Sequence, residues 1–156
     1  MNSLTIPYEI STFEALSRED QDLINEARTA MLNAHAPYSN FLVGSSVKDE
    51  NDKITTGNNQ ENAAYPSGLC AERVALFAAK SQSKAALKTI VVLAQNEKNE
   101  LADAFPCGSC RQVMLEYASL QETPIRVLMQ KKEGDYIVIG DVKQLLPFQF
   151  DADQLS

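Results

Sequence analysis

The three cysteines of this chain constrain its fold more than any other feature. Cys70 begins the string Cys-Ala-Glu-Arg, and Cys107 and Cys110 form the motif Pro-Cys-Gly-Ser-Cys. Three thiols cannot all pair within one chain, and in a reducing compartment such a set is typical of metal binding or catalysis. A catalytic zinc site takes three protein ligands and keeps one position open for water. The fold must therefore bring both motifs to one point.

Hydrophobic periodicity divides the chain into helices and strands. Ser17 is a typical helix cap, and Pro37 ends the helix that follows it. Both cysteine motifs begin helices that each precede a strand, so the two helix N-termini can meet. We expect helices at 17–34, 70–80, 107–118 and 142–146, and strands at 41–47, 53–56, 89–94, 125–130 and 136–139.

This order of elements predicts an α/β fold with a five-stranded mixed sheet between helices, in three layers, α/β/α. At 156 residues the chain is expected to form a single domain, residues 1–156. Residues 1–16 contain few periodic apolar positions, and we expect them to be an N-terminal extension that lies on the surface or on a neighbouring chain.

The charge of the chain narrows the classes of partner. Fourteen Lys and Arg residues face twenty-one Asp and Glu residues, which gives a net charge of −7. Because binding to a nucleic acid depends on basic side chains that neutralise phosphates, we expect no nucleic-acid partner. No apolar run is long enough to suggest a membrane span, and no secretory signal is visible at the N-terminus. These features predict a cytoplasmic protein without a membrane partner.

Glu72 is the second component of the predicted site. It lies two positions after Cys70 in the first turn of a predicted helix, where it can face the open position of the metal and move protons. Arg73 can donate hydrogen bonds to a ligand sulfur and offset the charge of three thiolates. Two plainer interpretations remain: Glu72 could be an ordinary acid at a helix start, and Cys107 with Cys110 could be a redox pair or half of a structural zinc site.

A loop upstream of the first cysteine motif suggests the substrate. Asn59 and Glu61 stand two residues apart and can bond to sugar hydroxyls, and the carboxylate would repel a phosphate, which favours a free nucleoside over a nucleotide. The alternative is an ordinary polar loop. His35 is the only histidine in the sequence, and its position after a helix makes it a weak candidate for a fourth metal ligand.

Four motifs in order carry a resemblance to a known family. They are Ala-Pro-Tyr-Ser-Asn-Phe at 36–41, Asn-Gln-Glu-Asn at 59–62, Cys-Ala-Glu at 70–72 and Pro-Cys-x-x-Cys at 106–110. Together they resemble cytidine deaminases of the short, all-cysteine, homotetrameric type. The resemblance covers residues 27–150, and it implies hydrolysis of cytidine and 2′-deoxycytidine to the uridines and ammonia, in pyrimidine salvage.

The resemblance also implies roles for particular residues. One Zn²⁺ per chain is held by Cys70, Cys107 and Cys110, and Glu72 shuttles protons. The implied substrate contacts are Phe41 on the pyrimidine ring, Asn59 and Glu61 on the ribose, the backbone N–H of Ala71 on the base carbonyl, and Phe150, or Phe148 instead, contributed by a neighbouring subunit.

Three alternatives stay open. Phe41 could belong to the core, since an aromatic residue at a strand start is often buried. The chain could be a deaminase of an aminoacyl cytosine nucleoside antibiotic, although we expect that relative to lack the 59–62 motif. It could also be a non-catalytic zinc or redox module.

Overall fold

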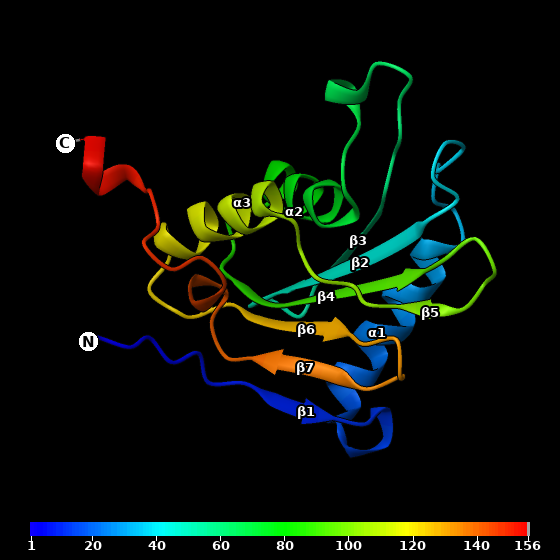
Figure 1. Cartoon of the computed structure of the whole chain (residues 1–156). Helices are drawn as coiled ribbons and strands as arrows, with labels where there is room; N and C mark the ends of the chain where they lie inside the picture. Colours follow the sequence, from blue (N-terminus) through cyan, green and yellow to red (C-terminus); the bar gives the residue numbers. More distant parts are fainter. Residues whose placement is uncertain (156) are drawn as a thin grey trace.

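A mixed β-sheet forms the centre of the computed structural model, which describes residues 1–155 (Figure 1). Its strands are β1 (Glu9–Ser11), β2 (Leu42–Asp49), β3 (Ile54–Asn58), β4 (Leu87–Gln95), β5 (Leu101–Ala102), β6 (Arg126–Gln130) and β7 (Tyr136–Ile139). They lie in the order β1-β7-β6-β4-β2-β3, with β5 also paired to β4. The β4–β6 pair is parallel and all other pairs are antiparallel.

The five predicted strands are all present, but the predicted strand number was wrong because the sheet has seven strands. The two additional strands are β1, with three residues, and β5, with two. Elements this short carry no readable alternation of apolar residues, and their existence depends on pairing with β7 and β4.

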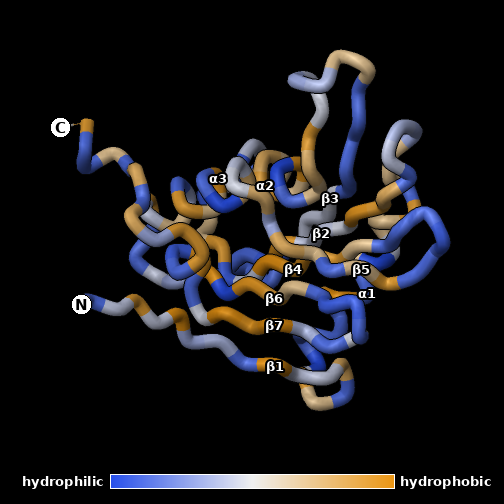
Figure 2. The backbone as a smooth tube through the Cα atoms, in the orientation of Figure 1, coloured by the Kyte–Doolittle hydropathy of each residue, from blue (hydrophilic) through white to orange (hydrophobic). Residues whose placement is uncertain are grey.

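Helices cover both faces of the sheet, which confirms the three-layer prediction. The helices are α1 (Arg18–Met31), α2 (Ala71–Gln82) and α3 (Gly108–Ser119), and the predicted C-terminal helix is a short 3₁₀ turn at Val142–Leu145. Successive residues of β4 point to opposite faces: Val91 packs in the cluster that contains Leu23 of α1, and Val92 packs in the cluster that contains Leu76 and Met114. Figure 2 shows hydrophobic residues concentrated along β4, β6 and β7.

Helix starts agree with the sequence prediction. Ser17 caps α1 by accepting a hydrogen bond from the Asp20 backbone N–H at 3.1 Å. Cys70 and Cys107 are the N-cap residues of α2 and α3. Among the described residues, no helix has both the length and the apolar character needed to cross a bilayer.

A glycine sets the distance between α2 and the sheet. A Cβ atom at Gly57 of β3 would lie 2.5 Å from the Ala75 nitrogen and 2.6 Å from the Ala71 carbonyl oxygen. Real Cβ contacts are never this short, so only glycine allows the backbones of β3 and α2 to approach this closely. The first turn of α2, which carries the predicted catalytic acid, is held by this contact.

The N-terminal extension takes part in the sheet. Residues 1–10 are exposed, as expected for a surface segment. However, Glu9, Ile10 and Ser11 pair with β7 in antiparallel register and form one edge of the sheet.

Candidate active site

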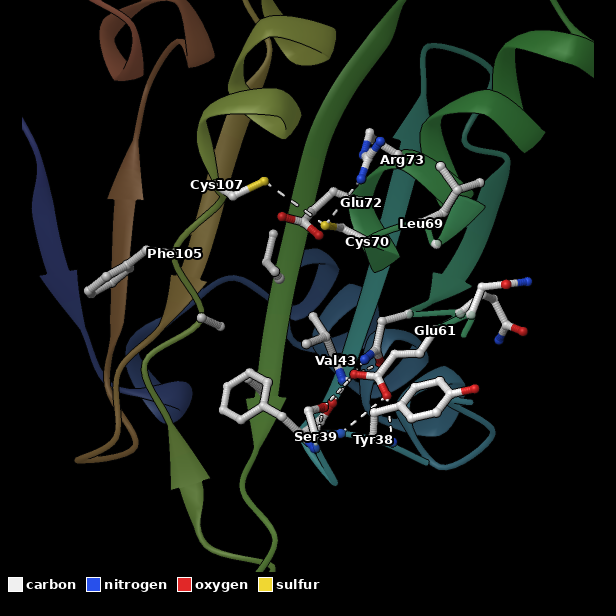
Figure 3. Close-up of a pocket in the computed structure, with 18 of the residues that line it drawn as sticks. Tyr38, Ser39, Val43, Glu61, Leu69, Cys70, Glu72, Arg73, Phe105 and Cys107 are labelled. Atoms are coloured by element: carbon white, nitrogen blue, oxygen red, sulfur yellow. Dashed lines mark hydrogen bonds between the residues drawn. The ribbon is translucent and has the colours of Figure 1, made fainter. Parts of the chain in front are cut away.

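The two cysteine motifs meet at the N-termini of α2 and α3 (Figure 3). The Sγ atoms of Cys70 and Cys107 lie 4.0 Å apart, and those of Cys107 and Cys110 lie 3.6 Å apart. All three Sγ atoms lie within 4.8 Å of one another. Zinc holds sulfur at about 2.3 Å, and tetrahedral geometry then separates neighbouring sulfurs by about 3.8 Å. The cluster therefore fits one zinc ion held by three thiolates.

The surroundings of the cluster favour negative charge on the sulfur of Cys70. A hydrogen bond from the Cys110 thiol, together with the Arg73 guanidinium, lowers the pKa of the Cys70 thiol from 9.0 to about 5. The same hydrogen bond, burial and the nearby Glu72 charge raise the pKa of Cys110. Arg73 Nη2 lies 3.5 Å from Cys70 Sγ and donates to it. The partial positive charge at the N-termini of α2 and α3 also favours the thiolate form of cysteine.

Glu72 lies beside the cysteines in the first turn of α2. Its side chain is only 4% exposed and lines the cavity next to Cys70 and Cys107 (Figure 3). Burial raises the pKa of the Glu72 carboxyl above its usual value, and negative charge on Cys70 raises it further. A raised pKa brings a carboxyl closer to the operating pH, which favours general acid–base chemistry.

The cavity in front of the cysteines has a volume of about 620 Å³, a size typical of small-molecule sites. Of the residues predicted from the sequence, those in its wall are Phe41, Asn59, Glu61, Cys70, Glu72, Arg73 and Cys107. Ala71 and Cys110 are fully buried and do not line it. Phe41 also packs against the core, as the alternative interpretation expects, and its contact with a pyrimidine ring stays a prediction.

Phe150 lies outside the cavity of its own chain. It is 57% exposed, and its carbonyl oxygen accepts a hydrogen bond from Gln112 Nε2 on α3. Phe148 is completely exposed and has a positive φ of 55°. Neither residue lines the cavity described here.

Asn59 and Glu61 already have partners within the protein. The Asn59 amide donates to the Phe41 carbonyl at 2.9 Å and accepts from the Val43 backbone N–H at 2.8 Å. The Glu61 carboxylate accepts hydrogen bonds from residues 38 and 39. The Ser39 hydroxyl, followed by the Tyr38 backbone N–H, lowers the pKa of Glu61 below its usual value. The two side chains therefore also hold the wall of the cavity in place.

Several residues in the wall of the cavity have no role that was predicted from the sequence. Tyr38 and Tyr65 meet edge to face at 6.3 Å between ring centroids, and Asp103 and Phe105 lie on the segment that leads into α3. Tyr38 could have been found, because it belongs to the 36–41 motif. His35 lies outside the cysteine group and instead pairs through its backbone with the 59–61 segment.

Comparisons with known proteins agree with this geometry. A family model for the cytidine and deoxycytidylate deaminase zinc-binding region matches residues 17–124. The chain belongs to this deaminase family. A cytidine deaminase from Halalkalibacterium halodurans is 38% identical over 136 residues, which are 87% of this chain and 97% of that protein. A cytidine deaminase from Sporosarcina psychrophila is 37% identical over 136 residues, 87% of this chain and 94% of the relative.

Solved structures of deaminases share the fold. The crystal structure of cytidine deaminase from Burkholderia pseudomallei has a TM-score of 0.73 and 35% identity, and it covers 86% of this chain and 100% of that one. The crystal structure of cytidine deaminase from Mycobacterium tuberculosis has a TM-score of 0.64 at 25% identity, with coverage of 86% and 98%. The deaminase family match contains all three cysteines, so the predicted zinc cofactor is confirmed. Residues 1–16 and Phe150 lie outside it.

Proposed function

We propose that the protein is a zinc-dependent cytidine deaminase that hydrolyses cytidine and 2′-deoxycytidine to uridine and 2′-deoxyuridine. One observation carries this proposal: Cys70 and Cys107, two of the three thiols able to hold one metal ion, line a single cavity together with the buried carboxyl of Glu72. Relatives at 37–38% identity are cytidine deaminases. The reaction consumes one water molecule and releases ammonia, because oxygen replaces the amino group at C4 of the base.

Zinc bound by Cys70, Cys107 and Cys110 supplies activation of the attacking water at neutral pH. Glu72 moves the protons. It takes one proton from the water, delivers it to N3 of the cytosine, and then assists the departure of ammonia from C4. The burial of Glu72 supports this role, since a carboxyl kept from bulk water can carry a proton through each step. We also assign the backbone N–H of Ala71 to the carbonyl of the base.

The walls of the cavity suit a nucleoside. Phe41 offers an apolar face for the pyrimidine ring, and Asn59 and Glu61 offer polar atoms for the sugar. Glu61 and Asp103 both place negative charge in the cavity wall. These carboxylates disfavour a substrate that carries phosphate, because like charges repel.

We further propose that the chain works as a cytoplasmic homotetramer, folded as one domain over residues 1–156, and has no nucleic-acid partner. The exposure of Phe148 and Phe150 supports the assembly, since either ring is free to reach the site of a neighbouring subunit. The net charge of −7 supports a small-molecule substrate rather than a polynucleotide.

A paired measurement tests the function: zinc per chain by elemental analysis, and ammonia release from cytidine. We expect one zinc per chain and uridine as the product. Glu72→Gln should keep the metal and the fold and lower kcat by about 10²- to 10⁴-fold, the usual range for loss of a general acid–base group. Activity on an aminoacyl cytosine nucleoside but not on cytidine would favour the antibiotic deaminase. Metal without turnover on either substrate would indicate a non-catalytic zinc module.

A further inference from the structure

Ser39 lies in the cavity wall, between the loop that carries Glu61 and the segment that carries Phe41. It lies in the loop between α1 and β2, and Glu61 lies in the loop between β3 and α2. The two loops run together through backbone bonds between His35 and Asn59 and between Glu61 and His35, both at 2.8–2.9 Å. Figure 3 shows Ser39, Tyr38 and Glu61 clustered at one end of the cavity, away from the cysteines.

The direction of the hydrogen bonds at Ser39 is determined by its partners. The Phe41 backbone N–H donates to Ser39 Oγ at 3.0 Å. The other partner of Ser39 Oγ is Glu61 Oε1, and an ionised carboxylate can only accept. The Ser39 hydroxyl hydrogen therefore points at Glu61. One hydroxyl group thus connects the predicted sugar-binding carboxylate to the backbone of Phe41, the residue predicted to contact the base.

The remaining contacts of Glu61 leave it little freedom. Its Oε2 accepts from the backbone N–H groups of Tyr38 at 2.9 Å and Ser39 at 3.3 Å. A carboxylate offers about four acceptor positions, and three are filled. The fourth is free for a hydrogen bond from a ligand. Of the three donors, only the Ser39 hydroxyl belongs to a side chain, so it is the only one that a substitution can remove without altering the backbone.

We propose that Ser39 is a positioning residue that fixes the Glu61 carboxylate for binding of the sugar of the substrate. The inference rests on the proposed function, because it takes a nucleoside as the ligand of this cavity. Ser39 acts through Glu61, and the loss of its hydroxyl leaves Glu61 with a wider range of orientations, which weakens nucleoside binding without touching the proton chemistry at Glu72.

Steady-state kinetics of the full-length holoenzyme test the proposal. In Ser39→Ala we expect the KM for cytidine to rise about five- to tenfold, in line with the net contribution of one ordinary hydrogen bond, while kcat changes less than about twofold. Binding that is equal in ground and transition states appears in KM alone. Ser39→Thr keeps the hydroxyl and should restore KM. A loss confined to kcat would overturn the proposal.

A double-mutant cycle with Glu61→Ala separates action through Glu61 from direct contact. In the Glu61→Ala background, Ser39→Ala should change KM by less than about twofold, because the partner is already gone. Independent effects that multiply would show that Ser39 contacts the substrate by itself.

A measurement without substrate keeps this inference distinct from the function. The pKa of the Glu61 carboxyl, followed by carbon-13 NMR, should rise in Ser39→Ala and return in Ser39→Thr, because the Ser39 hydroxyl is the largest cause of its lowered value. If wild-type protein released no ammonia from cytidine, the proposed function would fall, while this titration would still decide whether Ser39 fixes Glu61. An unchanged Glu61 pKa in Ser39→Ala would refute the positioning role.

Discussion

Substitution of Gly57 tests whether a close backbone contact positions the catalytic helix. Gly57→Ala adds one Cβ atom that would lie 2.5 Å from the Ala75 nitrogen and 2.6 Å from the Ala71 carbonyl oxygen. Both are backbone atoms of α2 and cannot rotate away as the end of a side chain could. Ordinary contact begins at 3.4 Å, so the first turn of α2 must move away from β3 by about 0.9 Å.

That displacement has two consequences of known size. Overpacking of this kind costs typically about 1–3 kcal/mol of folding free energy. For a domain of this length, each kcal/mol lowers Tm by about 2–4 °C, so we expect a decrease of about 2–12 °C. Cys70 and Glu72 move with the helix turn, and a misplacement of about 1 Å can cost about 10²-fold in rate. We therefore expect kcat to fall by about that factor.

Thermal unfolding followed by circular dichroism, together with kcat from ammonia release, measures both effects. Gly140→Ala is the matched control, because a Cβ at Gly140 meets nothing within 4 Å. It should leave Tm within about 1 °C of wild type and kcat unchanged. If Gly57→Ala behaved like Gly140→Ala in both measurements, the close approach of β3 would have no part in placing α2, and the reasoning would be refuted.

Two further predictions concern the metal and the core. Cys70→Ala should lose its zinc and unfold at a lower temperature than wild type, because metal binding stabilises the folded state; a chelator should lower the Tm of wild type but not that of the variant, and full zinc content in Cys70→Ala would indicate a different ligand set. Burial raises the pKa of the Tyr136 phenol above 10.0, so above about pH 10 the unfolded state binds fewer protons than the folded state and the free energy of unfolding falls as pH rises. Urea unfolding at several alkaline pH values should show a shallower fall for Tyr136→Phe, and equal slopes would argue against this origin.

Local signals in the sequence were enough to predict the main elements of the fold. The Ser17 cap and the apolar residues that follow it predicted α1. The continuous apolar run around Val91 and Val92 predicted β4. Both signals lie within one segment and need no knowledge of the rest of the chain. Strand β1 is different. Its three residues become a strand only because β7 offers an open edge, and no local pattern describes that partner.

The candidate site also contains features that local sequence predicts and features that depend on distant parts of the chain. The clustering of the three cysteines beside Glu72 could be predicted because residue type and spacing are typical of zinc sites. The role of Ser39 could not be predicted, because a serine has no chemical signature until its partners are known. Its partner Glu61 is 22 residues away, and the two meet only through the pairing of the loops at His35 and Gln60.

The cysteines at the N-caps of α2 and α3 affect both the stability of these helices and the chemistry of the site. N-cap positions favour Ser, Thr, Asp or Asn, whose side chains bond to free backbone N–H groups, and loss of such a bond costs about 1 kcal/mol. Cys70 and Cys107 occupy the N-caps of α2 and α3 without a side-chain capping bond. Both helices therefore forgo a capping bond so that their thiols can face each other. A metal ion held between them ties the two helix starts together, so the group that supports catalysis also replaces the stabilisation that capping would have given.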